Sequence, residues 1–333
     1  MKATLYQGYY LNNKIFDLMD VKANRDNCLY IYYSLKEAFS KKKIDFSTQD
    51  INNINDSSIV IYNDMPRVKP KASDVNKSYL LLRESEVIRP DNYDIKSHSC
   101  FTKIFTWDDR LVDNKKYFKI NFCFLFPTSI NTLLQNKVKL CALIAGNKTV
   151  SHPLELYSKR VEAIRWFENN HPEDFDLYGM GWDKYYFSGP KFIRALNRIK
   201  PLTRMLAPSY PSYRGKVVEK KSTLEKYKFA ICYENAKEIP GYITEKIFDC
   251  FFAGCVPIYW GADNVAEYIP SDCYIDKTKF NSYESLYDYI SCMPEHEYLD
   301  YLNAIDCYLH STQSDGFRAE INAAIIVKET VGE

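Results

Sequence analysis

The stretch from Lys228 to Gly261 constrains the fold more than any other part of the chain. Residues 228–233 form a short apolar run of strand length. Thr244 is placed to cap a helix whose apolar residues recur at helical spacing, namely Ile247, Phe248, Phe251 and Phe252. A second apolar run of strand length follows at 256–260. This strand–helix–strand order predicts a parallel sheet with a ligand site at the carboxyl ends of its strands.

The residues expected at that end of the sheet suit a sugar nucleotide. Backbone N–H groups at the start of the helix, together with Lys246, can hold the oxygens of a diphosphate. Glu245 accepts hydrogen bonds from sugar hydroxyls, and Tyr242 offers a flat face and a hydroxyl. For Glu245 and Lys246 taken alone, a helix start that happens to carry two charged residues is the better explanation.

A longer ordered motif favours the ligand site. Its parts are Tyr233-Glu234-Asn235, then Tyr242 to Lys246, then Gly254 to Pro257, and finally Gly261. In order and spacing it resembles the donor-site motif of the inverting α1,3/α1,4-fucosyltransferases of glycosyltransferase family 10. The resemblance covers about residues 75 to 290. It implies GDP-fucose as donor, an oligosaccharide or glycoconjugate as acceptor, and no required metal.

The first part of the chain has the composition of a mixed α/β domain. Expected strands are 29–33, 58–62 and 79–82, with a helix over 34–43 and a polar, Asn-rich loop over 45–56. The last of these strands delivers the segment Arg83 to Pro90 at its carboxyl end. A further apolar segment, 117–126, leads into a connection.

The second part repeats the alternation of strand and helix. A strand is expected at 140–146, a helix at 156–167 and a strand at 175–178, followed by a Lys-rich connection to Lys226 and the strand–helix–strand unit. We therefore place the domains at 1–136 and 137–333. The resemblance implies an α/β, GT-B-like fold with two Rossmann-like domains facing across a cleft. It also implies that the C-terminal helix, from about 316 to 328, can return to the first domain.

Inverting transfer needs a base that removes the proton of the acceptor hydroxyl. In the family this base is a Glu after a strand of the first domain, a few residues before a Pro. Glu84, six residues before Pro90, fits this pattern best, and Glu86 is the alternative because a small register shift exchanges the two. Taken alone, each Glu has the character of a solvated loop carboxylate. If Glu84 is the base, partial burial should raise its pKa.

The resemblance also indicates the donor-binding residues. Arg160, on the helix after the first strand of the second domain, matches an Arg that binds phosphate, and its planar fork suits two oxygens. A surface Arg paired with a carboxylate such as Glu155 remains the alternative. The complete expected donor-binding set is Asn147, Arg160, Asn235, Tyr242, Glu245 and Lys246.

Composition excludes several other classes. The net charge is +1, which gives no general attraction to nucleic acid or to an anionic membrane. There is no apolar run of eighteen residues and no signal peptide, so we expect a soluble, cytoplasmic chain without a membrane span, or one whose anchor is missing. The ten cysteines lack a Cys-x-x-Cys pair and the five histidines are dispersed, so reduced, mostly buried cysteines are expected.

Three charged segments are expected to be ordinary surface. They are Asp174 to Asp176 at the start of a strand, Trp107 to Asp109, and the basic residues between Arg214 and Lys221. Lining of the acceptor cleft is the alternative for Trp107 to Asp109, and proximity to the phosphates is the alternative for the basic residues.

The sequence thus predicts an inverting α1,3-fucosyltransferase that transfers fucose from GDP-fucose to a GlcNAc- or glucose-type unit of a glycan. Two alternatives stay open. One is a GT-B transferase that uses another nucleotide sugar, and the other is a non-catalytic protein that binds glycan or nucleotide. The acceptor and the linkage depend on loops of the first domain.

Overall fold

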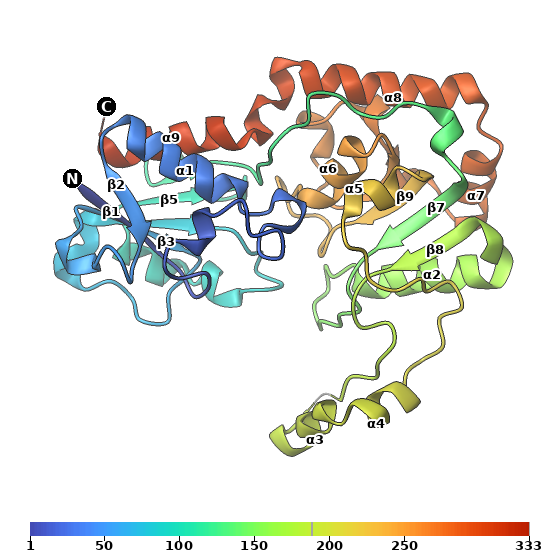
Figure 1. Ribbon diagram of the computed structural model, residues 1–333, viewed down its shortest axis with the longest axis horizontal. Coiled ribbons are helices and arrows are strands. Elements are labelled where there is room, and N and C mark those ends of the chain that lie inside the picture. The colour runs from blue at the N-terminus through green and yellow to red at the C-terminus, as the bar shows by residue number, and fades with distance from the viewer. Residues whose placement is uncertain (188, 333) are drawn as a thin grey trace.

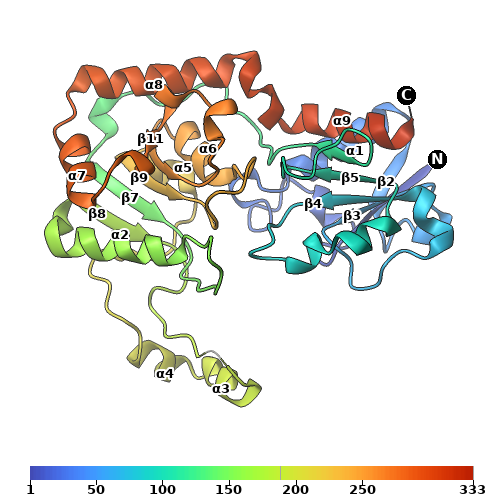
Figure 2. The ribbon, with the colours of Figure 1, turned by 180° about the vertical axis from the view of Figure 1, so that it is seen from behind.

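Two parallel sheets organise the computed structural model, which describes residues 1–187 and 189–332. The first sheet has the order β2-β1-β3-β4-β5-β6 and the second the order β11-β10-β9-β7-β8. All strand pairs in both sheets are parallel. Figures 1 and 2 show the two sheets side by side, each with its own helices. The α/β, GT-B-like fold class predicted from the sequence is confirmed.

The first sheet lies within the first 119 residues of the chain. Its strands are β1 (Lys2–Tyr6), β2 (Asp45–Thr48), β3 (Ile59–Asn63), β4 (Ser78–Leu82), β5 (Lys103–Thr106) and β6 (Tyr117–Lys119). Alternate residues of β3 enter two separate apolar clusters, Ile59 and Ile61 on one face and Val60 and Tyr62 on the other. Both faces of this sheet are therefore covered, as parallel sheets require.

The C-terminal helix completes the first sheet's core. Helix α1 (Tyr30–Lys41) and helix α9 (Ala319–Val331) pack against each other, and both contribute to the cluster that includes β1 and β3. Tyr79 of β4 donates a hydrogen bond through its hydroxyl to the backbone carbonyl of Thr330 at 3.2 Å. The long helix α8 (Glu295–His310) carries the chain back from the second sheet to this position (Figure 1).

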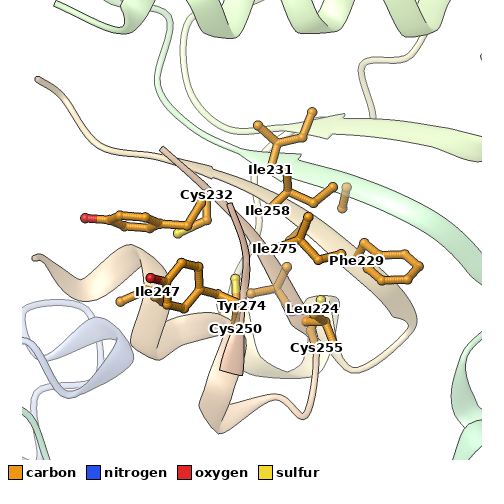
Figure 3. Packing of buried hydrophobic residues seen from close by; sticks show 14 of the residues in the cluster. Leu224, Phe229, Ile231, Cys232, Ile247, Cys250, Cys255, Ile258, Tyr274 and Ile275 are labelled. Carbon is orange, nitrogen blue, oxygen red and sulfur yellow. The ribbon is translucent and has the colours of Figure 1, made fainter. Parts of the chain in front are cut away.

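The second sheet holds the largest apolar cluster. Its strands are β7 (Lys139–Ile144), β8 (Phe175–Tyr178), β9 (Tyr227–Tyr233), β10 (Val256–Trp260) and β11 (Ile275–Asp276). Its helices are α2 (Tyr157–Asn170), α5 (Lys220–Leu224), α6 (Glu245–Phe252) and α7 (Tyr283–Ser291). Figure 3 shows Phe229 and Ile231 of β9 packed with Ile258 and Ile275 of the neighbouring strands. A continuous apolar run such as that of β9 is what a strand covered on both faces needs.

Two expectations for the first part of the chain were wrong. Residues 29–33 are not a strand, because Ile31, Leu35 and Phe39 recur every four residues and form the buried face of α1. The polar segment 45–56 is not all loop, because it contains the edge strand β2. The buried Ser47 and Thr48 in that strand find polar partners in Asn13, which the sequence pattern does not reveal. The apolar segment 117–126, for which no strand was predicted, begins with the short strand β6.

Candidate active site

A cavity of about 330 Å³ opens at the carboxyl ends of β7, β8 and β9. The chain leaves β7 toward β8 on one side and returns to β9 on the other, so the strand order reverses at this point. Open α/β sheets bind ligands at such a reversal because the loops on the two sides diverge. The lining includes residues 143–146 at the end of β7, residues 230–233 of β9 and the first turn of α6. The predicted strand–helix–strand unit thus contributes one wall of this cavity.

Gly179 allows the ends of β7 and β8 to approach each other beside the cavity. Its φ is +133°, and a Cβ there would lie 1.8 Å from the carbonyl oxygen of Ala145. No side chain can occupy that position without moving the backbone.

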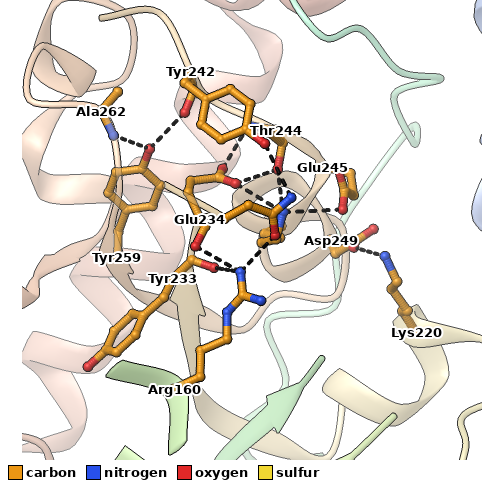
Figure 4. Close-up of polar contacts among 12 residues, drawn as sticks. Arg160, Lys220, Tyr233, Glu234, Tyr242, Thr244, Glu245, Asp249, Tyr259 and Ala262 are labelled. Atoms are coloured by element: carbon orange, nitrogen blue, oxygen red, sulfur yellow. Dashed lines mark hydrogen bonds and ion pairs between the residues drawn. The ribbon is translucent and has the colours of Figure 1, made fainter. Parts of the chain in front are cut away.

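Arg160 lies under this cavity and binds the end of β9. Its Nη2 donates to the carbonyl oxygens of Tyr233 at 2.7 Å and Glu234 at 2.8 Å, and to Oδ1 of Asn235 at 3.0 Å (Figure 4). The residue is only 4% exposed, and this burial lowers the pKa of its guanidinium. The pairing with Glu155 considered from the sequence is not what holds Arg160, since Glu155 accepts hydrogen bonds from Ser158 instead.

A buried carboxylate orders the start of α6. Glu234 is fully buried, and it accepts hydrogen bonds from the backbone N–H and the hydroxyl of Thr244 at 2.8 and 2.7 Å and from Lys246 Nζ at 3.0 Å. Thr244 stands at the N-cap position, as expected, but its hydroxyl is used by Glu234 rather than by the helix. Burial alone would lower the pKa of Lys246, but the carboxylates of Glu234 and Glu245 outweigh it and hold that pKa above its usual value.

A second cavity, of about 520 Å³, lies between the two sheets. Glu84, after β4, reaches it from the first sheet, and Phe252 of α6 lines it from the second. The side chain of Glu84 remains accessible to solvent, yet the surrounding walls remove part of its hydration. This loss raises its pKa, and the neighbouring carboxylates of Asp64 and Glu245 raise it further. The direction is the one expected from the sequence.

Both cavities share one wall, formed by Arg25, Lys220, Glu245 and Asp249. Lys220 Nζ lies 2.6 Å from Asp249 Oδ2, and its backbone N–H donates to Asp26 Oδ1 of the first domain at 3.0 Å. Burial by itself would raise the pKa of Glu245, but the ammonium groups of Lys246 and Lys220 hold it well below its usual range. Burial raises the pKa of Asp249 to about 6, although Lys220 opposes this shift.

The two cavities differ in charge. The first is lined by six cationic side chains and two carboxylates. The second is lined by four cationic side chains and four carboxylates. The cationic residues of the first are Arg25, Lys148, Arg160, Lys216, Lys220 and Lys246. The first cavity therefore favours an anionic ligand, and the second favours a ligand without net charge.

The structure brings five of the predicted site residues to these cavities. Arg160, Asn235, Glu245 and Lys246 line the first cavity, and Glu84 and Glu245 line the second. Glu245 thus lies between the two.

Among the residues that the structure describes, three predicted site residues lie outside both linings. Asn147 joins the ends of β7 and β8, since its side chain donates to the carbonyl oxygen of Gly181 at 3.2 Å. Tyr242 is buried against Trp107, with ring centroids 4.7 Å apart, and its hydroxyl accepts a hydrogen bond from Asn235. Glu86 pairs with Arg110 at 3.2 Å.

The three segments expected to be ordinary surface contain buried or shared charges. Asp176 is 3% exposed and lies 2.8 Å from Lys139 and 2.6 Å from Arg214, so it is a core ion pair rather than a surface carboxylate. Asp108 is fully buried and binds Arg110.

Asp109 connects the two domains. It accepts hydrogen bonds from Asn264 at 2.9 Å and from Tyr268 at 2.6 and 2.8 Å, and it pairs with Lys119 at 2.6 Å. Burial acts to raise the pKa of Asp109, but these three partners lower it overall. Lys220 is likewise not part of a solvated face, because it pairs with Asp249 in the shared wall.

Sequence reasoning missed three residues that shape the site, Arg25, Glu234 and Asp249, and it placed Lys220 near the phosphates only as the alternative to a solvated face. Asp249 could have been found, because it follows Glu245 by four residues and so lies on the same face of α6. Glu234 was part of the quoted motif, but its role was not recognised. Arg25 lies on a loop more than a hundred residues before the second sheet, and no local pattern connects it to that sheet.

The described cysteines are all free thiols, and six of them are buried, in agreement with the expectation from their spacing. One group of possible metal ligands occurs in the described part of the chain, His171, Glu173 and Asp174, whose ligand atoms lie within 4.8 Å of one another. It precedes the amino end of β8, at the opposite end of the strand from the cavities. Within residues 1–187 and 189–332, no helix is long and apolar enough to cross a bilayer.

Solved structures with this fold include several glycosyltransferases. A crystal structure of an α1,3-fucosyltransferase with GDP-fucose aligns over 100% of this chain and 90% of its own, with a TM-score of 0.54 and 15% identity. A DNA-modifying β-glucosyltransferase, studied with uridine diphosphoglucose, aligns over 100% of both chains with a TM-score of 0.57 and 11% identity. The fold and the cavity at its strand ends define a GT-B-like class of protein.

Sequence comparisons match part of this chain to one family of glycosyltransferases. Residues 191–316 match the model of glycosyltransferase family 10 (fucosyltransferase), C-terminal part. An α-(1,3)-fucosyltransferase of Helicobacter pylori is 32% identical over 152 residues, which are 41% of this chain and 31% of that enzyme. An α-(1,4)-fucosyltransferase of Arabidopsis thaliana is 42% identical over 64 residues, 19% of this chain and 16% of that one. The matched part of this chain is thus similar to the fucosyltransferases of glycosyltransferase family 10. It spans less than a third of the length of these two relatives.

Proposed function

We propose that this protein is an inverting α1,3-fucosyltransferase that transfers fucose from GDP-fucose to a hydroxyl of a GlcNAc- or glucose-type glycan. The observation that carries the proposal is the pair of adjoining cavities. The first has an excess of positive charge, and the second has a balanced charge and is lined by Glu84. A nucleoside diphosphate carries several negative charges and suits the first, whereas a neutral sugar hydroxyl suits the second.

In the proposed reaction, the acceptor hydroxyl attacks the anomeric carbon of fucose from the face opposite GDP. The bond from that carbon to the β-phosphate oxygen breaks, and its electron pair stays on the diphosphate. Glu84 takes the acceptor proton, and its raised pKa makes it a better base at neutral pH than an ordinary carboxylate.

The leaving diphosphate is stabilised by fixed positive charge in the first cavity. The three contacts of Arg160 described above all use Nη2. A guanidinium has five N–H donors, so Nη1 and Nε are the donors that we assign to phosphate oxygens. Lys246 is held by Glu234 at the first turn of α6, where backbone N–H groups also favour an anion. Neither role calls for a metal ion, so we propose a reaction that requires none.

Sequence relatives, rather than the fold, support the choice of donor. The related structures include proteins described with GDP-fucose and with uridine diphosphoglucose, so this fold accommodates more than one nucleotide. The curated relatives, which include a mouse 4-galactosyl-N-acetylglucosaminide 3-α-L-fucosyltransferase 9 at 36% identity over 85 residues, are fucosyltransferases. Their matched segments support GDP-fucose as the donor.

A calorimetric titration with GDP-fucose, GDP-mannose and UDP-sugars tests the donor. We expect GDP-fucose to bind most tightly, and a preference for a UDP-sugar would support the alternative GT-B transferase. An acceptor array with GDP-fucose, followed by linkage analysis of the product, then identifies the acceptor and the linkage. If Glu84→Gln and Glu86→Gln together leave the biological function intact, the protein is a non-catalytic binding protein.

A further inference from the structure

Residues 184–187 and 189–206, which we call the basic arm, project away from both sheets. The arm contains helix α3 (Lys191–Ala195) and helix α4 (Lys200–Met205). Figures 1 and 2, which view the molecule from opposite sides, both show α3 and α4 extending beyond α2 and β8. Among the described residues of the arm, only Thr203 is buried.

The arm exposes large apolar side chains that join none of the apolar clusters of the described structure. Phe192 is 74% exposed and Met205 is 75% exposed. The other large apolar residues exposed on the arm are Tyr185, Tyr186, Ile199 and Leu206. A concentration of exposed apolar side chains in one short segment marks an interaction surface.

Local polar contacts hold the arm in shape. Asn197 accepts a hydrogen bond from the backbone N–H of Phe187 and donates one to its carbonyl oxygen, both at 2.9 Å. The backbone N–H of Tyr185 donates to the carbonyl oxygen of Thr203 at 2.8 Å. These hydrogen bonds therefore fix the conformation of the arm, and its apolar side chains remain exposed to water.

All the charged side chains of the arm are positive. Within residues 184–206 there are six cationic side chains and no Asp or Glu. The cationic residues are Lys184, Lys191, Arg194, Arg198, Lys200 and Arg204. The net charge of +1 for the whole chain hides this local excess, which composition did not reveal.

We propose that the basic arm docks on an anionic lipid surface, where its cations bind headgroups and its apolar side chains enter the boundary of the acyl region. Short segments that interleave Lys and Arg with Phe, Leu or Met bind membranes in this way. Nucleic acid would satisfy the cations but leave Phe192 and Met205 in water. A second copy would bring two positively charged arms together, which is unfavourable.

Both ends of the arm connect to the lining of the first cavity. Met180 precedes the arm and Lys216 follows it, and both line that cavity. Docking of the arm therefore holds this cavity close to the lipid surface. The inference does not depend on the proposed enzymatic activity.

The test is flotation of the full chain with phosphatidylcholine vesicles, with and without 30 mol% phosphatidylglycerol. We expect binding to the anionic vesicles at low salt, weak binding to the neutral vesicles, and a decrease as salt rises. Arg194→Gln/Arg198→Gln/Arg204→Gln should weaken binding on the order of 100-fold, since each cation near the surface contributes about fivefold. Phe192→Ser/Met205→Ser should also release the protein.

Matched controls carry equal changes elsewhere on the surface. Arg67→Gln/Lys71→Gln/Lys96→Gln removes three exposed cations, and Met19→Ser/Val68→Ser removes two exposed apolar side chains. Both should bind vesicles like the wild type. Thermal unfolding should be unchanged in the arm variants, because their side chains lie outside the apolar clusters.

Three results would overturn the proposal. In the first, the wild type does not float with anionic vesicles. In the second, the arm variants bind as tightly as their controls. In the third, the wild type forms a dimer or binds DNA through the arm but binds no vesicles, which would assign the arm to another partner.

Discussion

The two adjoining cavities contrast a site built mainly from regular elements with one built largely from loops. The first lies at the ends of β7, β8 and β9 and against α6, and carries six cations against two carboxylates. The second takes Glu84, Arg83 and the loop around Arg25 from the first domain, and its charges balance at four and four. The difference teaches that strand ends can place a fixed group of cations, whereas the position of the carboxylate we propose as the base depends on how loops from both halves of the chain meet.

The largest effect is expected at Glu84. Glu84→Gln keeps the shape of the side chain but cannot accept the acceptor proton, so turnover should fall about 10²- to 10⁴-fold. The affinity for GDP, measured by calorimetry, should stay within about twofold of the wild type. Glu86→Gln is the matched control, since Glu86 pairs with Arg110 outside both cavities, and it should retain most of the turnover. The reverse outcome would assign the base to Glu86.

A second test concerns the charge of the first cavity. Arg160→Lys keeps the charge but loses the planar fork, so GDP binding should weaken about 10-fold or more. Arg165→Lys alters the same helix at a residue that pairs with Glu168, and it should bind GDP normally. Thermal unfolding of both variants separates loss of binding from loss of fold. Equal GDP affinity of the two variants would contradict the assignment of Arg160 to phosphate.

The wall shared by the cavities should make stability depend on pH. Asp249 faces Lys220, Glu245 and Asp26, and its pKa in the folded protein is about 6, above the 3.8 of a free side chain. A carboxyl group whose pKa is raised by folding stabilises the folded state fully below the unfolded pKa and loses this contribution as pH rises through the folded pKa. Between about pH 4 and 7 the wild type should therefore lose stability relative to Asp249→Asn, on the order of 2 kcal/mol. Urea unfolding at several pH values measures this difference, and parallel curves would contradict it.

The acid limb of the pH–rate profile tests the environment of Glu84. Its raised pKa predicts that kcat/KM falls as pH drops through a value above that of a free Glu, by up to about tenfold per pH unit. Glu86→Gln should leave the limb in place. A limb at or below the pKa of a free Glu would argue against partial burial of the base.

The smallest expected effect is that of a chelator. If fixed cations alone neutralise the diphosphate, EDTA should change turnover by less than about twofold. A large loss that added Mg²⁺ or Mn²⁺ restores would show that the charge of the first cavity is insufficient without a metal.

Much of the second sheet could be predicted because its signals are local. The run 228–233 became β9, and the apolar spacing of Ile247, Phe248 and Phe251 became the buried face of α6. The first sheet was harder to predict. The edge strand β2 is polar, and the aromatic residues at the start of α1 have the composition of a strand although their spacing is helical.

The lining of the first cavity was predictable where a motif supplied order and spacing, as for Asn235, Glu245 and Lys246. Side-chain contacts were not predictable where more than one partner lies within reach and the tertiary structure determines which one is contacted. Tyr242 has the position of a donor contact in the motif but is buried against Trp107 of the other domain. Glu84 and Glu86 stand two residues apart on one loop, yet Glu84 lines the second cavity whereas Glu86 pairs with Arg110 outside it.

The sequence by itself determined the alternation of strand and helix, the end of the second sheet at which the first cavity opens, and the cationic character of that end. These properties follow from periodicity and spacing within a few turns of chain. Only the tertiary structure decided which carboxylate faces the cavity and which cations come from the other domain. The contact of Lys220 with Asp26 joins residues 194 positions apart, and no local pattern encodes such a pairing.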